Sequence, residues 1–394
     1  MDVDLRARRR LFLQVLAATP LAAAAAWAQQ AALPAGRLAS PDDAITVMDF
    51  EPAAQAVLPP AHWGYMASGV DDDLTIKANR DGFTHYRLRP RRLVDVSTVD
   101  MTTDVFGSTW AMPLFLSPVG GQKMFHSAGE IAVARAAKQR KVTQILSTAT
   151  SVAVEDVAQA LGTPPWYQLY MPVKWESTEQ LVRRVEALGC PVLVWTVDLL
   201  GGRNMVTAER YRRLDTRRCG ACHSSPRGGR TVAELPMFTG LEGGMNPAGA
   251  TWNDVDRLKK LTRMKLVIKG LDTREDARLA REHGADGIIV SNHGGRATET
   301  GRGTIDALSE VIDGADGLPV FVDGGFRHGT DIFKALALGA KAVGIGRPYV
   351  WALSAFGQEG VDRVIEILHD ELQLTMRQCG TPRVKDITRA AVAT

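Results

Sequence analysis

Short runs of apolar residues recur along the chain between Met112 and Arg347, and most end in Gly, Ser, Asp or Lys. Apolar residues are continuous within each run, which indicates strands that are buried on both faces. Stretches with a helical period separate many of the runs. The predicted strands are Met112–Pro118, Thr143–Thr148, Pro165–Tyr170, Pro191–Asp198, Lys265–Gly270, Gly287–Asn292, Pro319–Gly325 and Ala342–Arg347, and helical stretches begin at Gly129, Val154, Ser177, Thr273 and Gly329.

A strand followed by a helix, repeated eight times, predicts an α/β fold of the TIM (β/α)8 barrel class. The rival arrangement is an open doubly wound sheet, but no G-x-G-x-x-G segment occurs near the start of the chain. The connection between the fourth and fifth strands, about residues 204–264, is far longer than the others. We therefore expect a barrel with a long insertion at that point.

Composition narrows the class of protein. The 394 residues are 45% hydrophobic and 23% charged, which is typical of a globular enzyme and excludes collagen-like, coiled-coil and disordered chains. Lys and Arg together number 47 against 44 for Asp and Glu. Because nucleic-acid binding requires a clear excess of basic residues, we expect no nucleic-acid partner.

The N-terminus has the pattern of an export signal. An arginine cluster precedes the apolar run Leu11–Ala26, and a small-x-small cleavage motif ends at Ala28. Arg9 and Arg10 before that run resemble a twin-arginine signal, which predicts a periplasmic protein. An uncleaved membrane anchor is the alternative, and no stable membrane span is expected after signal removal. The predicted divisions are a signal at 1–28, a flexible leader at 29–46 and the barrel at 47–394.

Polar residues gather where the predicted strands end. In a barrel the chemistry lies at the carboxyl ends of the strands. A single Asp or Ser in such a place is often only a helix cap, and a single His often only packs, but several strands contribute here. These residues are Gln168 and Tyr170, Thr196 and Asp198, Lys269, and Ser291, Asn292, His293 and Arg296.

The seventh and eighth strands end in segments suited to a phosphate. These segments are Asp323–Arg327 and Gly344–Arg347. Glycines let backbone N–H groups approach an anion, and the following helix N-termini favour negative charge. Arg327 and Arg347 add positive charge. The position accepts a phosphorylated substrate as readily as a phosphorylated cofactor.

The remaining rim residues suggest a redox reaction. His293 with Asp198 forms a base whose protonated state a carboxylate stabilises. Arg296 can hold a substrate carboxylate beside that base. Lys269 would place positive charge where a flavin ring becomes anionic on reduction. Together they indicate oxidation at a carbon next to a carboxylate.

The chain resembles a known family. The segments Lys269–Arg296 and Asp323–Pro348 are similar to those of the FMN-dependent α-hydroxy-acid oxidases and dehydrogenases, the group of glycolate oxidase, lactate oxidase, mandelate dehydrogenase and flavocytochrome lactate dehydrogenase. The resemblance runs from about Val47 to Pro382. It implies a TIM barrel that binds FMN and oxidises an L-2-hydroxy acid to a 2-oxo acid. Whether the hydrogen leaves as a proton or a hydride stays open.

The resemblance also implies roles for individual residues. His293 matches the family's base and Asp198 its partner, while Arg296 matches the residue that binds the substrate carboxylate. Tyr65 corresponds to a tyrosine near that carboxylate, and Tyr170 to one that faces the substrate hydroxyl. The implied FMN contacts are Pro118, Val119, Gly120, Ser147, Gln168, Thr196, Lys269, Ser291, Asp323, Gly325, Arg327, Gly346 and Arg347.

Two departures from the family pattern bear on the substrate. A second carboxylate-binding arginine is matched by Arg203, but about two residues early, so its role is open. Ala149 stands where glycolate oxidase has a bulky tryptophan, which predicts room for a substrate larger than glycolate.

A cysteine motif in the long insertion is not part of the family pattern. Cys219, Cys222 and His223 have the C-x-x-C-H form of a covalent haem c attachment site. A short disulfide, a metal site and coincidence are the alternatives. A twin-arginine signal argues against haem, since that route carries folded chains whereas haem c is attached to unfolded ones.

We therefore predict a periplasmic FMN-dependent L-2-hydroxy-acid dehydrogenase or oxidase that acts on a lactate-like substrate. The electron acceptor would be a cytochrome, a quinone or oxygen, and we expect a homo-oligomer. A barrel lyase or isomerase acting on a phosphorylated substrate, and an exported electron-transfer module that carries haem c, are the rival functions.

Overall fold

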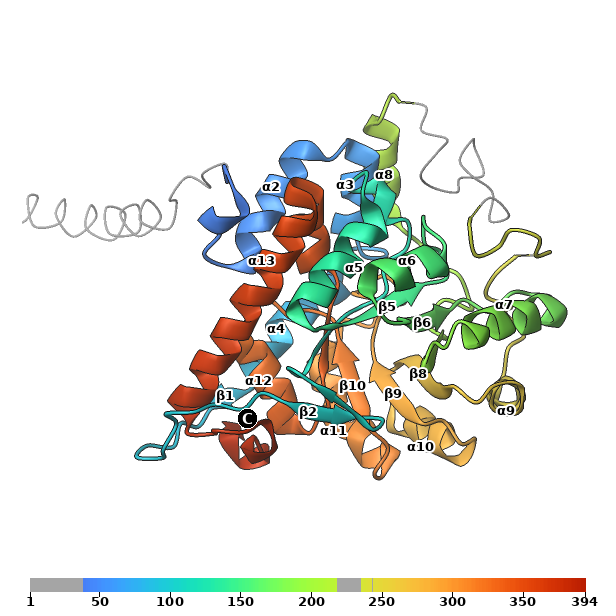
Figure 1. Cartoon of the computed structure of the whole chain (residues 1–394). Coiled ribbons are helices and arrows are strands. Elements are labelled where there is room, and N and C mark those ends of the chain that lie inside the picture. The colour runs from blue at the N-terminus through green and yellow to red at the C-terminus, as the bar shows by residue number, and fades with distance from the viewer. Residues whose placement is uncertain (1–37, 218–234, 243) are drawn as a thin grey trace, which may run out of the picture. The chain divides into compact units, whose positions relative to one another are not determined.

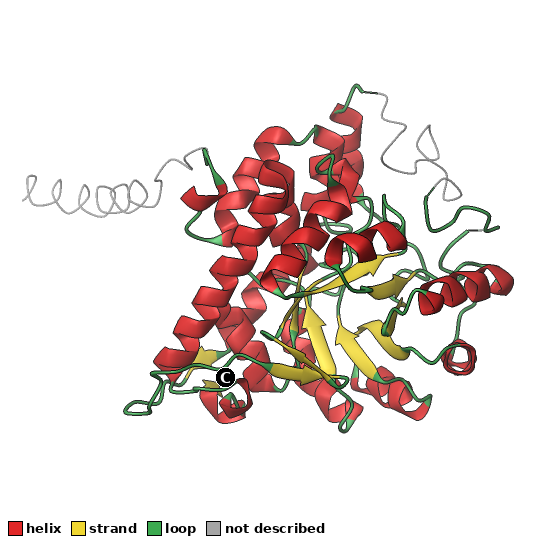
Figure 2. Ribbon diagram, viewed as in Figure 1, coloured by secondary structure: helices red, strands yellow, loops and turns green. Residues whose placement is uncertain are grey.

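Eight parallel strands close into a barrel in the computed structural model, as Figure 2 shows with the strands in yellow and the helices around them in red. The structure describes residues 38–217, 235–242 and 244–394. The predicted signal peptide and the Cys219, Cys222 and His223 motif lie outside the described residues. The barrel strands are β4 (Leu114–Leu116), β5 (Thr143–Ser147), β6 (Trp166–Leu169), β7 (Val192–Thr196), β8 (Lys265–Leu271), β9 (Gly287–Val290), β10 (Val320–Asp323) and β11 (Val343–Ile345).

A helix follows each barrel strand, so the predicted TIM barrel is confirmed and the open sheet is excluded. The helix α13 is interrupted at Gly357, where φ is 62°. The outer helices are α5 (Gly129–Arg140), α6 (Val154–Leu161), α7 (Trp175–Ala187), α9 (Trp252–Leu261), α10 (Arg274–Glu282), α11 (Thr304–Ala315), α12 (Gly329–Leu338) and α13 (Arg347–Cys379).

The predicted insertion lies between β7 and β8 and contains the helix α8 (Val206–Leu214). Further helices precede the barrel, namely α2 (Phe50–Val57), α3 (Pro60–Ala67) and α4 (Leu74–Asp81). In Figure 1, α3 and α8 lie side by side, and the structure packs them directly against each other. A segment before the barrel and a segment from its insertion thus meet.

A two-stranded hairpin, β2 (Thr103–Val105) and β3 (Ser108–Trp110), closes the amino-terminal end of the barrel. Trp110 lies 5.3 Å from Trp166 between ring centroids, and Phe106 lies 6.0 Å from Phe321. Burying these aromatic rings stabilises that end of the barrel. The carboxyl ends of the strands are therefore left as the place for a site.

The folded unit begins at Ser40, rather than at 47 as the division into leader and barrel expected. Ser40 N donates to Asp43 Oδ2 at 2.8 Å, and Arg363 in α13 donates to the Ala44 carbonyl at 3.0 Å. Ala44 is buried. The described end of the predicted leader is therefore folded, with Ala44 held to α13, while residues 29–37 lie outside the described residues.

Within the described ranges, no helix is both long and apolar enough to cross a membrane.

Candidate active site

A cavity opens at the carboxyl ends of the strands, where the sequence predicted the chemistry. Strand register aligns the rim residues, because Ser147 pairs with Gln168 and Thr196 pairs with Lys269. Of the predicted residues, those that line the cavity are Tyr65, Pro118, Val119, Gly120, Tyr170, Lys269, His293, Arg296, Asp323, Gly325, Arg327, Gly346 and Arg347. Those that lie beside or behind the lining are Ser147, Gln168, Thr196, Asp198, Arg203 and Ser291.

His293 is held between a carboxylate and a phenol. Its Nδ1 lies 2.9 Å from Asp198 Oδ1, and its Nε2 lies 3.3 Å from the Tyr170 hydroxyl. The planes of the Tyr170 and His293 rings are 23° apart. Since Asp198 accepts from Nδ1–H, Nε2 is the nitrogen that faces the cavity without a proton. This arrangement presents a base toward Tyr170.

Burial and charge set the protonation of this pair. Burial lowers the pKa of His293 below its ordinary value, although Asp198 opposes the shift, and the Lys269 and Arg203 charges lower the pKa further. Burial alone would raise the pKa of Asp198, but His293, Lys269 and Arg203 hold it below its ordinary value. The imidazole is therefore neutral and the carboxylate charged near pH 7.

Two guanidinium groups converge on Tyr65. Arg296 lies with Cζ 4.0 Å from the centroid of the Tyr65 ring. Burial would raise the pKa of Tyr65, but the charges of Arg296 and Arg203 and their hydrogen bonds hold it below its ordinary value. Arg203, although it stands about two residues early compared with the family pattern, therefore interacts with the same tyrosine as Arg296. In the described part of the chain, buried Arg296 Nε has no hydrogen-bond partner, so a donor is left for an anion.

Lys269 lies at the floor of the cavity in a network of polar side chains. Its Nζ donates to Ser291 Oγ at 2.6 Å and lies 3.3 Å from Asp323 Oδ2. Asp323 also accepts from Ser291 Oγ at 2.6 Å and from Ser117 Oγ at 3.0 Å. Asp323 thus balances the buried lysine charge and fixes its position.

The far end of the cavity is cationic. Burial and the neighbouring charge of Arg80 lower the pKa of Arg327 to about 10, and burial with the charges of Arg296 and Arg327 lowers the pKa of Arg347 to about 9. Buried Arg327 Nε is without a hydrogen-bond partner among residues that the structure describes. A dianion placed here would relieve the repulsion and occupy the open donor.

Arg327 and Arg347 differ in their contacts. Arg347 donates to the carbonyls of Met66, Ser68 and Gly294 at 2.8, 3.0 and 2.7 Å. Its guanidinium thus ties the C-terminal end of α3 to the loop after β9, and Arg347 also lines the cavity. Of these two arginines, Arg327 is therefore the one with a donor left open among the described residues.

Glycines make room around this end. A Cβ on Gly344 would come within 2.4 Å of Ser117 Oγ, and one on Gly325 within 2.0 Å of the Asn79 carbonyl oxygen. No heavy atom lies within 4 Å of the Cβ position of Gly346, which lines the cavity. The backbone here is close enough for N–H groups to meet an anion.

Several contributors to the site were not predicted. Ser117 follows β4 and bonds Asp323, and its place at a strand end is a signal that could have identified it. Met205 Sδ lies 3.8 Å from Arg296 Nη2, and a methionine in a long insertion carries no such signal. The Met66 and Ser68 carbonyls belong to the backbone, which no sequence motif marks.

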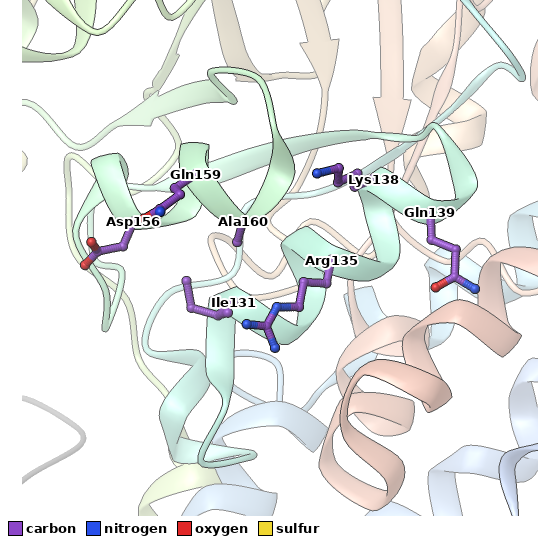
Figure 3. Close-up of a pocket in the computed structure, with 7 residues that line it drawn as sticks. All are labelled: Ile131, Arg135, Lys138, Gln139, Asp156, Gln159 and Ala160. Atoms are coloured by element: carbon purple, nitrogen blue, oxygen red, sulfur yellow. The ribbon is translucent and has the colours of Figure 1, made fainter.

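A second hollow lies on the outside of the barrel, between α5 and α6 (Figure 3). Arg135 and Lys138 from α5 and Asp156 and Gln159 from α6 line it, and all four are exposed. Charged and polar side chains at the surface of two outer helices require no ligand. The cavity around His293 is therefore the candidate site.

Comparison with known proteins gives one consistent result. The family model described as FMN-dependent dehydrogenase matches residues 54–394. A peroxisomal (S)-2-hydroxy-acid oxidase of Oryza sativa subsp. japonica is 40% identical over 358 residues, which cover 89% of this chain and 96% of that protein. An L-lactate dehydrogenase (cytochrome) of Wickerhamomyces anomalus is 36% identical, over 87% of this chain and 60% of that protein.

Solved structures agree with this fold. A mandelate oxidase crystal structure is 36% identical with a TM-score of 0.79, and the match covers 89% of this chain and 98% of that one. A flavocytochrome b2 variant with pyruvate bound is 35% identical with a TM-score of 0.79, over 90% of this chain and 88% of that one.

Proposed function

Because the chain belongs to the FMN-dependent dehydrogenase family, as an FMN-dependent 2-hydroxy-acid oxidase or dehydrogenase, we propose that it oxidises a lactate-like L-2-hydroxy acid to the 2-oxo acid. The observation that carries this proposal is the convergence of a neutral, carboxylate-backed imidazole and two guanidinium groups on one cavity. The rice relative's name specifies an (S)-2-hydroxy acid, which supports the L configuration.

The residues at the rim fit FMN. Buried polar atoms without partners, Gln168 Nε2 and Thr196 Oγ1 among the described residues, lie at strand ends next to the cavity and suit the polar edge of a flavin. Arg327 and the glycines after β10 and β11 would hold the phosphate, and Lys269 the electron-rich part of the ring. When bound, FMN supplies an acceptor for two electrons.

His293 takes up a proton from the hydroxy acid. Its Nε2 is unprotonated and faces the cavity, and the charge that it acquires is stabilised by Asp198 at 2.9 Å. Tyr170 stays protonated, because burial raises the pKa of its hydroxyl. It therefore serves as a hydrogen-bond donor to the substrate oxygen beside His293.

Arg296, Arg203 and Tyr65 hold the substrate carboxylate. The Arg296 guanidinium keeps an open Nε donor within the described contacts, and Arg203 approaches the Tyr65 hydroxyl. A carboxylate bound between two guanidiniums is fixed in direction, which orients the adjacent carbon toward His293.

The substrate side chain is larger than that of glycolate. Ala149 lies in the loop after β5 and faces the loop after β4, since a Cβ on Gly120 would come within 2.9 Å of the Ala149 Cβ. A methyl group at this position leaves space that a larger side chain would fill.

The electron acceptor follows from the proposed location. The twin-arginine pattern supports a periplasmic protein, and export favours transfer to a cytochrome or quinone over oxygen. One relative is named for cytochrome and others for oxidase activity, so either route occurs among similar proteins. Covalent haem at Cys219 and Cys222 would give the protein an electron carrier of its own, and a haem band that survives denaturation tests for it.

An anaerobic reduction assay tests the function. Purified protein should be yellow, and its flavin absorbance should bleach when L-lactate or a larger L-2-hydroxy acid is added. Oxygen or a cytochrome added afterwards identifies the acceptor by the rate of recovery. A colourless preparation that cannot be loaded with FMN, as a lyase or isomerase on the same barrel would give, contradicts the proposal.

A further inference from the structure

The chain that enters the insertion passes beside the carboxylate-binding residues, since Met205 contacts Arg296 and Arg203 reaches Tyr65, and its position depends on one helix pair. The helix α8 lies against α3, and Figure 1 shows the two together beside the barrel. No residue of α8 is fully buried, so this helix is held almost entirely by the face that it turns toward α3. Tyr65, which meets both carboxylate-binding arginines, is a residue of α3.

The two helices interlock at Gly64. A Cβ built on Gly64 would lie 2.2 Å from Tyr211 Cβ and 2.7 Å from Tyr211 Cγ. Real Cβ atoms do not approach so closely, and neither backbone can yield without separating the helices. Only glycine fits at this contact, and the residue that follows it is Tyr65.

Polar contacts fix both ends of the pair. At one end Asp215 Oδ2 accepts from the Ala61 N–H at 3.2 Å. At the other end Thr207 Oγ1 donates to Asp73 Oδ2 at 2.6 Å. Asn204 Nδ2 donates to Asp71 Oδ1 at 2.7 Å, just beside Arg203. The interlock therefore sets where the chain enters α8.

The residues at that entry contact the groups that would hold the substrate carboxylate. Arg203 acts on Tyr65, and Met205 Sδ lies 3.8 Å from Arg296 Nη2. We propose that Gly64 and Tyr211 are positioning residues for the hydroxy-acid carboxylate, because their contact holds Arg203 and Met205 over the Tyr65 and Arg296 pair. This inference rests on the proposed function, and it explains how Arg203 reaches the site despite its shifted place in the sequence.

The Gly64→Ala variant tests the proposal in the FMN-loaded full chain. We expect its KM for the L-2-hydroxy acid and its dissociation constant for oxalate to rise about tenfold or more, because one of two carboxylate donors is displaced. The FMN affinity should stay within about threefold, since the phosphate end is untouched, and the limiting rate of flavin reduction should fall by less than the KM rises, since His293 keeps its contacts and Arg296 still orients the substrate. Oxalate has no hydroxyl-bearing carbon and no carbon-bound hydrogen, so it does not undergo this oxidation and its binding is read from the flavin spectrum without turnover.

Matched variants separate positioning from general damage. Gly249→Ala makes the same substitution in open space and should behave as wild type. Tyr211→Phe keeps the Cβ and Cγ atoms that meet Gly64 and should retain tight oxalate binding, whereas Tyr211→Ala should weaken it. Tyr211→Ala also serves as the test if Gly64→Ala does not fold.

A double-variant cycle tests whether the weaker oxalate binding of Gly64→Ala depends on Arg203. In an Arg203→Met background, Gly64→Ala should weaken oxalate binding less than about twofold further. Three outcomes would each overturn the proposal. The first is that the two changes weaken oxalate binding independently, and the second is that oxalate binding is unchanged in both Gly64→Ala and Tyr211→Ala. The third is that FMN is lost in parallel with oxalate. If wild-type protein binds oxalate but no hydroxy acid reduces its flavin, the proposed oxidation fails while the interlock is still tested by oxalate.

Discussion

Three successive residues after β9 have left-handed backbones, and the first of them is His293, with φ of 57°. Gly294 and Gly295 follow with φ of 69° and 78°. Such a conformation is costly for a residue with a side chain and is kept where function requires it. The sharp turn brings Nδ1 of His293 to Asp198 and leaves Nε2 facing the cavity.

Removing the imidazole tests this geometry. His293→Ala should slow flavin reduction by about 10²–10⁴-fold, because the base is lost while FMN contacts remain. Rapid mixing under anaerobic conditions measures the rate, and the bound flavin absorbance serves as control. A variant that retains rapid reduction would show that the base lies elsewhere.

The pH dependence of reduction follows from the same pair. Neutral His293 is the active form, so the rate should fall as the pH drops through its pKa, which burial places below the ordinary value. Asp198 raises that pKa, so Asp198→Asn should move the acid limb to still lower pH while reducing the maximum rate. Rates measured between about pH 4.5 and 8 test this, and a limb that stays or moves upward in Asp198→Asn contradicts it.

At this scale the sequence identified side chains at strand ends and little else. His293, Asp198, Arg296 and Lys269 could be predicted because each lies at or just after the carboxyl end of a predicted strand, where a barrel gathers its polar groups. Tyr65 was identified only through the family resemblance. It lies in α3, which precedes the barrel, so it follows no predicted barrel strand. The carbonyls that bind Arg347 and the sulfur beside Arg296 depend on packing between distant segments, which leaves no local pattern.

At the scale of elements, the ends of the strands fix the positions of the side chains in the site. Gly270 lies in β8 with φ of 104°, and a Cβ there would come within 2.7 Å of Asp198 Cβ. The strand is irregular in its pairing between Lys269 and Leu271. This irregularity lets Lys269 point into the cavity while Gly270 makes room for the carboxylate that orients His293.

Gly270→Ala should therefore behave like a partial loss of Asp198. We expect flavin reduction to slow by about a hundredfold, because the carboxylate is pushed away from the imidazole. Gly284→Ala is the control, since Gly284 has φ of 74° but open space around its Cβ position, and it imposes backbone strain alone. Equal effects of the two substitutions on the reduction rate would refute the steric reason.

The elements themselves were partly predictable. Continuous apolar runs gave the centre of every barrel strand, and helices such as α5, α6 and α12 begin at the predicted residues. The helices α3 and α8 were not predicted, and α8 has no buried residue to produce an apolar period. Its place is set by contact with α3, a segment distant in sequence.

At the scale of the whole molecule, barrel closure encloses a cluster of positive charge. Arg296 and Arg327 are buried and Arg347 is half-buried at one end of the barrel, and mutual repulsion contributes to the lowered pKa of Arg347. The repeat of strand and helix predicted closure, and the glycine and arginine segments predicted an anion site. The free-energy cost of enclosing these like charges without a bound anion could not be predicted from the sequence, because it depends on how completely the guanidinium groups are buried.

That cost predicts how the protein freed of its flavin should respond to anions. Inorganic phosphate should raise its Tm, since a dianion that binds only the folded state stabilises it by about 2.7 kcal/mol at a hundred times its dissociation constant, or roughly 3–4 °C for a chain of this size. Arg327→Leu removes the guanidinium with the open donor and should abolish most of this rise. It should also have a higher Tm than wild type without phosphate, because a buried guanidinium whose pKa burial and the charge of Arg80 lower, and whose Nε has no partner among the described residues, is gone. Arg135→Leu, in the outer hollow of Figure 3, removes an exposed charge of the same sign and should leave the phosphate response intact. Equal phosphate responses in wild type and Arg327→Leu would place the anion elsewhere and remove the physical basis for the phosphate end of the cavity.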